Sequence, residues 1–201
     1  MAAWQSIFTT YRTLTGRVLG LLVFVYVLMA APPQLLPGWL LECGELVGFA
    51  LLTVAAFGRV WCLMFIAGRK SQELTTEGPY SVVRNPLYVF SFLGAIGLGL
   101  AVENLFLTAV FAIFFALTYP ITVAHEEADL LSLFGPAYID YCEMTPRWLP
   151  NWRLYKQPES LVVSPIRVLH GMIDAMWFLW VFLAWEILEM LRETGVLQTW
   201  F

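Results

Sequence analysis

The chain reads Gly78-Pro79-Tyr80-Ser81-Val82-Val83-Arg84-Asn85-Pro86-Leu87-Tyr88 between two long apolar runs. The Gly-Pro pair stops any preceding helix, and proline disfavours helical geometry in the residue before it, so Asn85-Pro86 predicts a new helix beginning at Pro86. The free backbone N–H groups of a helix start, reinforced by Arg84, favour an anionic group such as a carboxylate or phosphate. We therefore expect a polar corner between two apolar segments.

The composition places the chain in a membrane. Hydrophobic residues make up 60% of it and charged residues 13%, against roughly 45–50% and about 25% in soluble domains. A chain of 201 residues leaves little room for a soluble domain, so we predict an all-α integral membrane protein whose chemistry lies at helix ends and in short loops. The net charge of −4 argues against a nucleic-acid partner. Cys43, Cys62 and Cys142 lack paired spacing and are predicted to be small apolar fillers.

About five apolar stretches approach the roughly 20 residues that a membrane-spanning helix needs. They cover residues 18–36, 39–66, 86–101, 105–124 and 168–191. Only Val102-Glu103-Asn104 separates the third from the fourth, which predicts a tight helical hairpin, and nearby glycines allow the backbones to approach closely. We expect three parts: residues 1–73 with the first two spans, residues 74–157 with the hairpin and the polar corner, and residues 158–201 with a linker and the last span.

The cationic residues lie in alternate connections, with Arg59 inside the second span and Arg192 after the last as exceptions. They precede the first span, follow the second and precede the last, whereas the two turns in between contain none. By the positive-inside rule, the N-terminus and the polar segments of this multi-pass protein are expected on the cytoplasmic face.

A second polar patch follows the hairpin. It reads His125-Glu126-Glu127, then Phe134-Gly135-Pro136, Tyr138, Tyr141 and Pro146-Arg147. Carboxylates at the end of a span either mark the water boundary or serve a function, because turning one inward costs desolvation energy. Arg147 is either a headgroup contact or a clamp for an anion. No second His or Cys stands at ligand spacing, so we predict no metal site.

Taken in order, these motifs resemble the integral-membrane methyltransferases typified by isoprenylcysteine carboxyl methyltransferase, with relatives among phospholipid N-methyltransferases. The family pattern is approximately G-P-Y, R-H-P-x-Y, E-E, F-G, Y-x-x-Y and P-R, and the match covers about residues 74–150. The resemblance implies an S-adenosylmethionine site enclosed by the hairpin and short cytosolic helices. A membrane lipid or another lipophilic acceptor would reach it from the bilayer.

The resemblance also implies roles for individual residues. The cofactor carboxylate is expected at the corner of Arg84, and an amine or hydroxyl group at one of the adjacent glutamates, with tyrosines as walls. Catalytic roles fall to Glu127, the nearest base for an amine acceptor, and to Arg147. The expected cofactor-binding residues are Gly78, Pro79, Tyr80, Arg84, Asn85, Pro86, Tyr88, Glu126, Glu127, Tyr138 and Tyr141.

Asn85 departs from the family pattern, which has histidine at this position. Asparagine forms hydrogen bonds but does not titrate. Two alternatives to a methyltransferase stay open: an NADPH-dependent membrane reductase related to sterol reductases, and a non-catalytic membrane scaffold. The sequence does not distinguish between four acceptors: a prenylated cysteine, a phospholipid amine, an isoprenoid and a small thiol. The last span is expected to serve dimerisation or acceptor binding.

Overall fold

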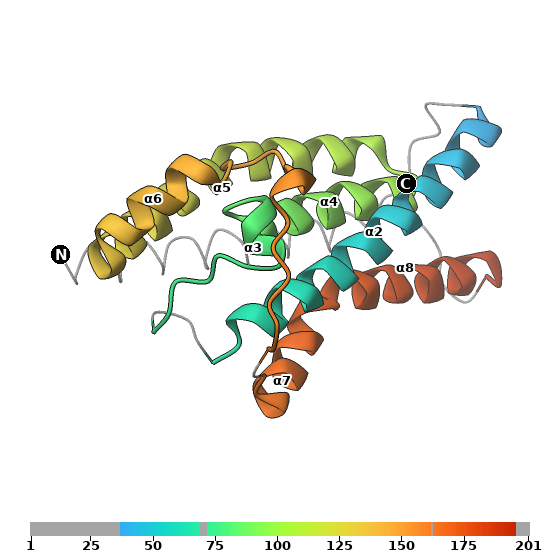
Figure 1. Ribbon diagram of the computed structural model, residues 1–201. Coiled ribbons are helices and arrows are strands. Elements are labelled where there is room, and N and C mark those ends of the chain that lie inside the picture. The colour runs from blue at the N-terminus through green and yellow to red at the C-terminus, as the bar shows by residue number, and fades with distance from the viewer. Residues whose placement is uncertain (1–36, 69–71, 162, 196–201) are drawn as a thin grey trace, which may run out of the picture. The chain divides into compact units, whose positions relative to one another are not determined.

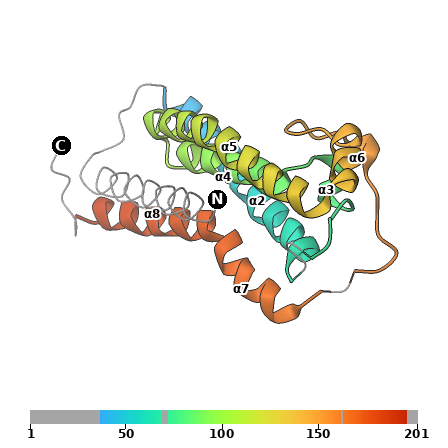
Figure 2. The same cartoon turned by 90° about the vertical axis from the view of Figure 1, so that its left-hand side faces the viewer.

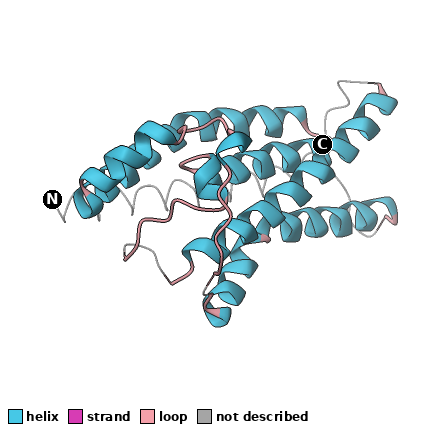
Figure 3. Cartoon of the chain, viewed as in Figure 1, coloured by secondary structure: helices cyan, strands magenta, loops and turns pink. Residues whose placement is uncertain are grey.

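The computed structural model describes residues 37–68, 72–161 and 163–195, and every regular element among them is a helix (Figure 3). Residues Gly38–Trp185 form one compact unit, and the residues from Glu186 onward belong to a second one. The first predicted span, residues 18–36, lies outside the described residues. The elements are α2 (Gly38–Ile66), α3 (Pro79–Val82), α4 (Pro86–Ala101), α5 (Leu105–Phe134), α6 (Pro136–Met144), the 3-10 turn η1 (Trp152–Leu154), α7 (Pro165–Ala175) and α8 (Trp177–Glu193).

Three helical stretches are long and apolar enough to cross a membrane: Gly38–Ile66, Leu105–Phe134 and Pro165–Arg192. The shorter α4 is also apolar. Only 33%, 17% and 18% of their most apolar windows are buried within the protein, so most of that apolar surface faces outward. Exposing such apolar surface to water would cost free energy, whereas the hydrocarbon core of a membrane accommodates it. The prediction of an all-α integral membrane protein is confirmed.

Helices α2, α4 and α5 run side by side (Figures 1 and 2). Residues 102–104 join α4 to α5 at one end, and the Asn104 side chain caps α5 by accepting a hydrogen bond of 3.0 Å from the Leu107 N–H. The predicted tight hairpin is therefore confirmed. We call this the hairpin end of the bundle. The opposite end, which carries α3, α6 and residues 145–156, is called the polar end.

Glycines bring α2 and α4 into backbone contact. A Cβ atom added at Gly48 would lie 2.4 Å from the Ala101 backbone nitrogen and 2.7 Å from the Gly97 carbonyl oxygen. A Cβ atom at Gly97 would lie 2.9 Å from the Gly48 carbonyl oxygen. Backbone atoms of two packed helices cannot move aside as a flexible side chain can, so this crossing depends on small residues.

The variant Gly48→Val is therefore expected to be destabilised by at least about 2 kcal/mol, the scale of an overpacked core. The matched control is Gly44→Val on the same helix, because a Cβ atom there would meet nothing within 4 Å. Thermal unfolding in detergent compares the two variants. Equal melting temperatures would contradict the close α2–α4 crossing.

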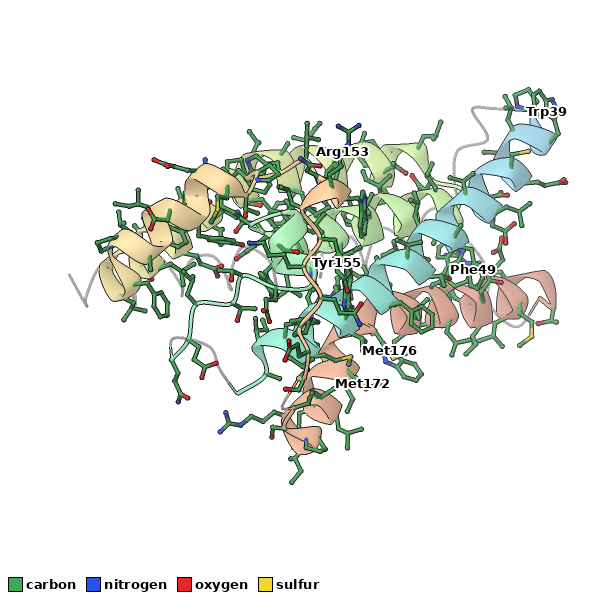
Figure 4. All side chains as sticks on the ribbon, viewed as in Figure 1. Trp39, Phe49, Arg153, Tyr155, Met172 and Met176 are labelled. Atoms are coloured by element: carbon green, nitrogen blue, oxygen red, sulfur yellow. The ribbon has the colours of Figure 1, made fainter. Side chains whose placement is uncertain are left out.

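The last predicted span is divided in the structure. Helix α7 ends at Ala175, Met176 forms its C-cap, and α8 starts at Trp177 (Figure 4 labels Met172 and Met176). The break turns Phe178 inward, where its ring packs over Gly94 of α4 and lies 5.8 Å from the Arg59 guanidinium of α2. In the first half of α8, the ring of Phe182 lies 5.8 Å from that of Phe49 on α2.

Candidate active site

The two polar patches of the sequence meet at the polar end. The backbone N–H of Arg84 donates to the Pro146 carbonyl (2.8 Å), and the backbone N–H of Asn151 donates to the Val82 carbonyl (3.0 Å). Further along, the Gly78 N–H donates to the Lys156 carbonyl (2.8 Å). The segment 146–156 is therefore fixed along α3 and the corner that follows it, as Figure 1 shows. This places Arg147 beside Arg84, although 63 positions separate them in sequence.

Gly78 is required at the start of this corner. Its φ of +58° lies in the left-handed region that favours glycine, and a Cβ atom would lie 2.2 Å from the ring of Phe65 on α2. Pro79 then opens α3, Val83 is extended, and Asn85 precedes Pro86 at the start of α4. The predicted helix start at Pro86 is confirmed, whereas the sequence did not indicate the short helix α3.

Glu127, near the end of α5, lies at the centre of a charged cluster. Its Oε1 is 3.5 Å from Nη1 of Arg84, and its Oε2 is 2.9 Å from Nη2 of Arg147. The Asn85 amide also donates to Oε1 (3.2 Å) and to the Arg147 carbonyl (3.3 Å). The Arg84 and Glu127 side chains are each 16% exposed. Two guanidinium groups facing one carboxylate leave a net positive charge, which favours an anionic ligand.

The pKa of Arg84 is raised overall. Burial works to lower it, but the negative charge of Glu127 and the contact with Cys142 raise it by more. Arg84 therefore keeps its charge while largely shielded from water, a state that a nearby carboxylate stabilises.

Three buried donors around the cluster have no hydrogen-bond partner among the described residues. They are Nε of Arg84, Nε of Arg147 and the hydroxyl of Tyr80. A buried donor without a partner costs about 1–3 kcal/mol. Protein sites rarely retain several of them together unless a ligand or water satisfies them. The cluster therefore has the donors that a bound anion would require.

Tyrosines form one wall beside the cluster. The Tyr141 hydroxyl donates to the Tyr80 carbonyl (2.7 Å), and the Tyr138 and Tyr141 rings are 6.0 Å apart and buried. Burial raises the pKa of both phenols, and so does the charge of Glu127. Burial also raises the pKa of Tyr80 well above its usual range. These phenols stay neutral at physiological pH and offer ring faces and O–H donors rather than bases.

The other predicted residues lie around this centre. Glu126 is half-buried, and its charge is one cause of the raised pKa of Tyr80. Tyr88 packs its ring edge-on against Tyr119 of α5, with centroids 4.8 Å apart. Pro79 and Pro86 line a separate apolar groove, whose lining includes none of the charged residues. The structure thus gathers Arg84, Asn85, Glu127 and Arg147 into one cluster and sets the remaining predicted residues at its edges.

Cys142 was missed by the sequence analysis. Its thiol accepts a hydrogen bond of 2.8 Å from Nη1 of Arg84, so the prediction that it is a small apolar filler is wrong. Cys142 follows Tyr138 by four residues and Tyr141 by one, which places Cys142 and Tyr138 on the same face of α6. That helical spacing was the available signal. Within the described part of the chain, no three His, Cys, Asp or Glu residues gather as a metal site.

The fold and the site define a membrane-embedded helical protein with a charged cluster at one end of its bundle. The family model of phospholipid methyltransferase matches residues 40–137, from α2 into α6. Protein-S-isoprenylcysteine O-methyltransferase of Schizosaccharomyces pombe is 31% identical over 87 residues, which cover 42% of this chain and 37% of that protein. Over these residues the chain is similar to the integral-membrane methyltransferases, and the resemblance that its motifs predicted is confirmed.

Two further relatives match a larger part of the chain. The nickel-cobalt-cadmium resistance protein NccN of Alcaligenes xylosoxydans xylosoxydans is 35% identical over 195 residues, covering 97% of this chain and 91% of the relative. The cobalt-zinc-cadmium resistance protein CzcN of Cupriavidus metallidurans is 38% identical over 152 residues, covering 76% and 70%. No solved structure matches the chain.

Proposed function

We propose that this protein transfers a methyl group from S-adenosylmethionine to a lipophilic or membrane-associated acceptor at the polar end of the bundle. The observation that carries the proposal is the cluster of Arg84, Asn85, Glu127 and Arg147, with unsatisfied buried donors beside it. The similarity to integral-membrane methyltransferases supports the reaction class.

The donor set fits the chemical groups of the cofactor. A carboxylate suits the unsatisfied guanidinium N–H groups of Arg84 and Arg147, and an ammonium group suits the carboxylates of Glu126 and Glu127. A purine suits the ring faces of Tyr138 and Tyr141. When bound, S-adenosylmethionine would supply a methyl group on a sulfonium, which an acceptor displaces in line. The protein then mainly has to align the donor and the acceptor and to exclude water.

Glu127 is better placed to position the arginines than to remove a proton. Both of its oxygens are already held by positioned donors, the guanidinium groups of Arg84 and Arg147 and the Asn85 amide. An acceptor that is already anionic, such as a carboxylate or a thiolate, needs no base. The geometry therefore favours an anionic acceptor atom over a protonated amine.

Asn85 fits the proposal despite its departure from the family pattern. Its amide donates to Glu127 and to the Arg147 carbonyl, and both contacts need a donor rather than a titrating ring. This observation supports an intact site over a non-catalytic scaffold. An NADPH-dependent reductase would need several more cations for the cofactor phosphates than the two arginines of this cluster.

Transfer of labelled methyl groups tests the proposal. Purified protein is incubated with methyl-labelled S-adenosylmethionine and a total membrane lipid extract, and the label in the organic phase is counted. We expect incorporation by the wild type and its loss in Arg147→Ala, with Arg153→Ala, an exposed arginine on η1, as the matched control. No incorporation above a protein-free blank would count against the proposal. We also propose that the polar end faces the cytoplasm, in accord with the positive-inside distribution.

The names of NccN and CzcN lead to a physiological proposal. We infer that methyl transfer by this protein contributes to resistance to divalent transition-metal ions. Expression in a cadmium-sensitive bacterial host is expected to raise the tolerated cadmium concentration, and Arg147→Ala is expected to abolish that gain while Arg153→Ala retains it. If the Arg147→Ala variant still gave full cadmium tolerance, resistance would not depend on the charged cluster.

A further inference from the structure

The thiol of Cys142 lies at the charged cluster rather than in an apolar interior. Its sulfur accepts a hydrogen bond of 2.8 Å from Nη1 of Arg84, which is 58 positions away in sequence. Cys142 is partly exposed, whereas Cys62 on α2 is fully buried. A contact with a cation, rather than burial, therefore distinguishes Cys142.

The same sulfur also reaches the tyrosine wall. Burial is the largest cause of the raised pKa of Tyr138, followed by the charge of Glu127 and a hydrogen bond with Cys142. A hydrogen bond that the neutral phenol donates opposes its ionisation, so the Tyr138 hydroxyl donates to the sulfur. Cys142 follows Tyr138 by four residues on α6, a spacing that brings side chains of one helix face together. The sulfur thus joins the charged cluster to the tyrosine wall.

Arg84 has one nitrogen that the protein occupies and one that is open to a ligand. Nη1 lies 3.5 Å from Oε1 of Glu127 and 2.8 Å from the Cys142 sulfur. Nε is buried and has no hydrogen-bond partner among the described residues. Because a guanidinium is planar and rigid, two acceptors on Nη1 fix the direction in which the Nε–H group points. With Glu127 as its single acceptor, the group would be free to turn about that contact.

Arg147 is oriented in a different way. Its Nη2 lies 2.9 Å from Oε2 of Glu127, and its guanidinium carbon lies 5.7 Å from the centre of the Trp148 ring. A guanidinium stacks favourably on an aromatic face, which restrains its plane. Besides Glu127, Arg147 thus has an aromatic face to orient it, and Arg84 has a sulfur.

The geometry points to Cys142 as a positioning residue of the donor site. Its sulfur holds the Arg84 guanidinium in the plane that leaves Nε to the bound anion, and it ties this cation to Tyr138. The inference rests on the proposed S-adenosylmethionine site and adds to it a residue that lies one position beyond the Y-x-x-Y motif and belongs to none of the motifs.

Replacement of the sulfur tests the inference. Purified full-length variants in detergent are titrated calorimetrically with S-adenosylhomocysteine. We expect Cys142→Ala to bind about 10-fold more weakly than the wild type, the loss that accompanies one hydrogen bond to a charged group. Cys142→Ser should bind within about twofold of the wild type, because a hydroxyl oxygen also accepts from Arg84. The matched control is Cys43→Ala on α2, an exposed cysteine that should be replaced without effect.

Melting temperatures separate positioning from packing. Without ligand, the wild type and the three variants should unfold at the same temperature, because Cys142 is partly exposed. A weaker affinity of Cys142→Ala that came with a lower melting temperature, and that serine did not rescue, would assign Cys142 to packing and overturn the inference.

A double-mutant cycle with Arg84→Lys shows whether Cys142 acts through Arg84. In the Arg84→Lys background, Cys142→Ala should cost no more than about twofold in affinity, because lysine has no guanidinium plane to hold. Equal losses in both backgrounds would overturn the positioning role, while saturable binding by the wild type preserved the donor site. Absence of binding by the wild type would overturn both, so the two failures are distinguishable.

Discussion

Glu127→Gln is expected to abolish the rise in melting temperature that saturating S-adenosylhomocysteine gives the wild type. The substitution removes the negative charge that lies between Arg84 and Arg147, so the two guanidinium groups face each other without a counter-ion. Loss of a charge-assisted contact costs about 1.5–3 kcal/mol, and the displaced arginines add to that cost. We expect affinity to fall by about 100-fold, since each factor of ten corresponds to about 1.4 kcal/mol.

The matched control for this variant is Glu143→Gln, the same change on an exposed side chain of α6. Its melting temperature with and without ligand should equal that of the wild type. A ligand-induced shift in Glu127→Gln as large as in the wild type would show that the cluster takes no part in donor binding. Circular dichroism of both variants should show unchanged helix content, because glutamate and glutamine have nearly equal helix propensities.

Arg84→Lys is expected to lower the affinity for S-adenosylmethionine by about 10- to 30-fold, although the positive charge is kept. Nη1 of Arg84 contacts both Glu127 and the Cys142 thiol, and its buried Nε remains available to a ligand. A lysine ammonium is a single point charge and cannot reproduce the planar set of donors. The loss corresponds to about 1.5–2 kcal/mol, the value of one hydrogen bond to a charged group.

Equilibrium dialysis with labelled S-adenosylmethionine measures this effect, with Arg153→Lys as the control at an exposed position. Arg84→Ala should bind more weakly still, because it also removes the charge. If Arg84→Lys bound as tightly as the wild type, the cluster would need only a positive charge at this position, and the role assigned to Nε would be wrong.

The sequence predicted the parts of the site that depend on polar residues in an apolar context. Arg84 at a helix start and Glu127 at the end of a span are unusual enough to be recognised one by one, and the order of the motifs related them to a family. The sequence did not predict that Arg84 and Arg147 both contact Glu127. This contact depends on the segment 146–156 lying along α3, where long-range backbone hydrogen bonds hold it.

Other features of the structure could not be predicted from the sequence. The groove is built from valines, prolines and tryptophans that look like ordinary residues of a span, so only their arrangement around Phe90 and Gly58 reveals it. The break at Met176 has neither glycine nor proline beside it, and it coincides with the packing of Phe178 against Gly94. Cys142 was overlooked because an isolated cysteine is usually a small apolar residue.

The central claim is a donor site for S-adenosylmethionine, and calorimetric titration of the detergent-purified protein with S-adenosylhomocysteine tests it most directly, with NADPH titrated in parallel. We expect saturable binding of S-adenosylhomocysteine with a stoichiometry of about one per chain, as for a single preformed pocket, and no heat of binding from NADPH. Binding of NADPH alone would instead assign the site to a reductase, and no binding of either ligand would contradict a functional donor site.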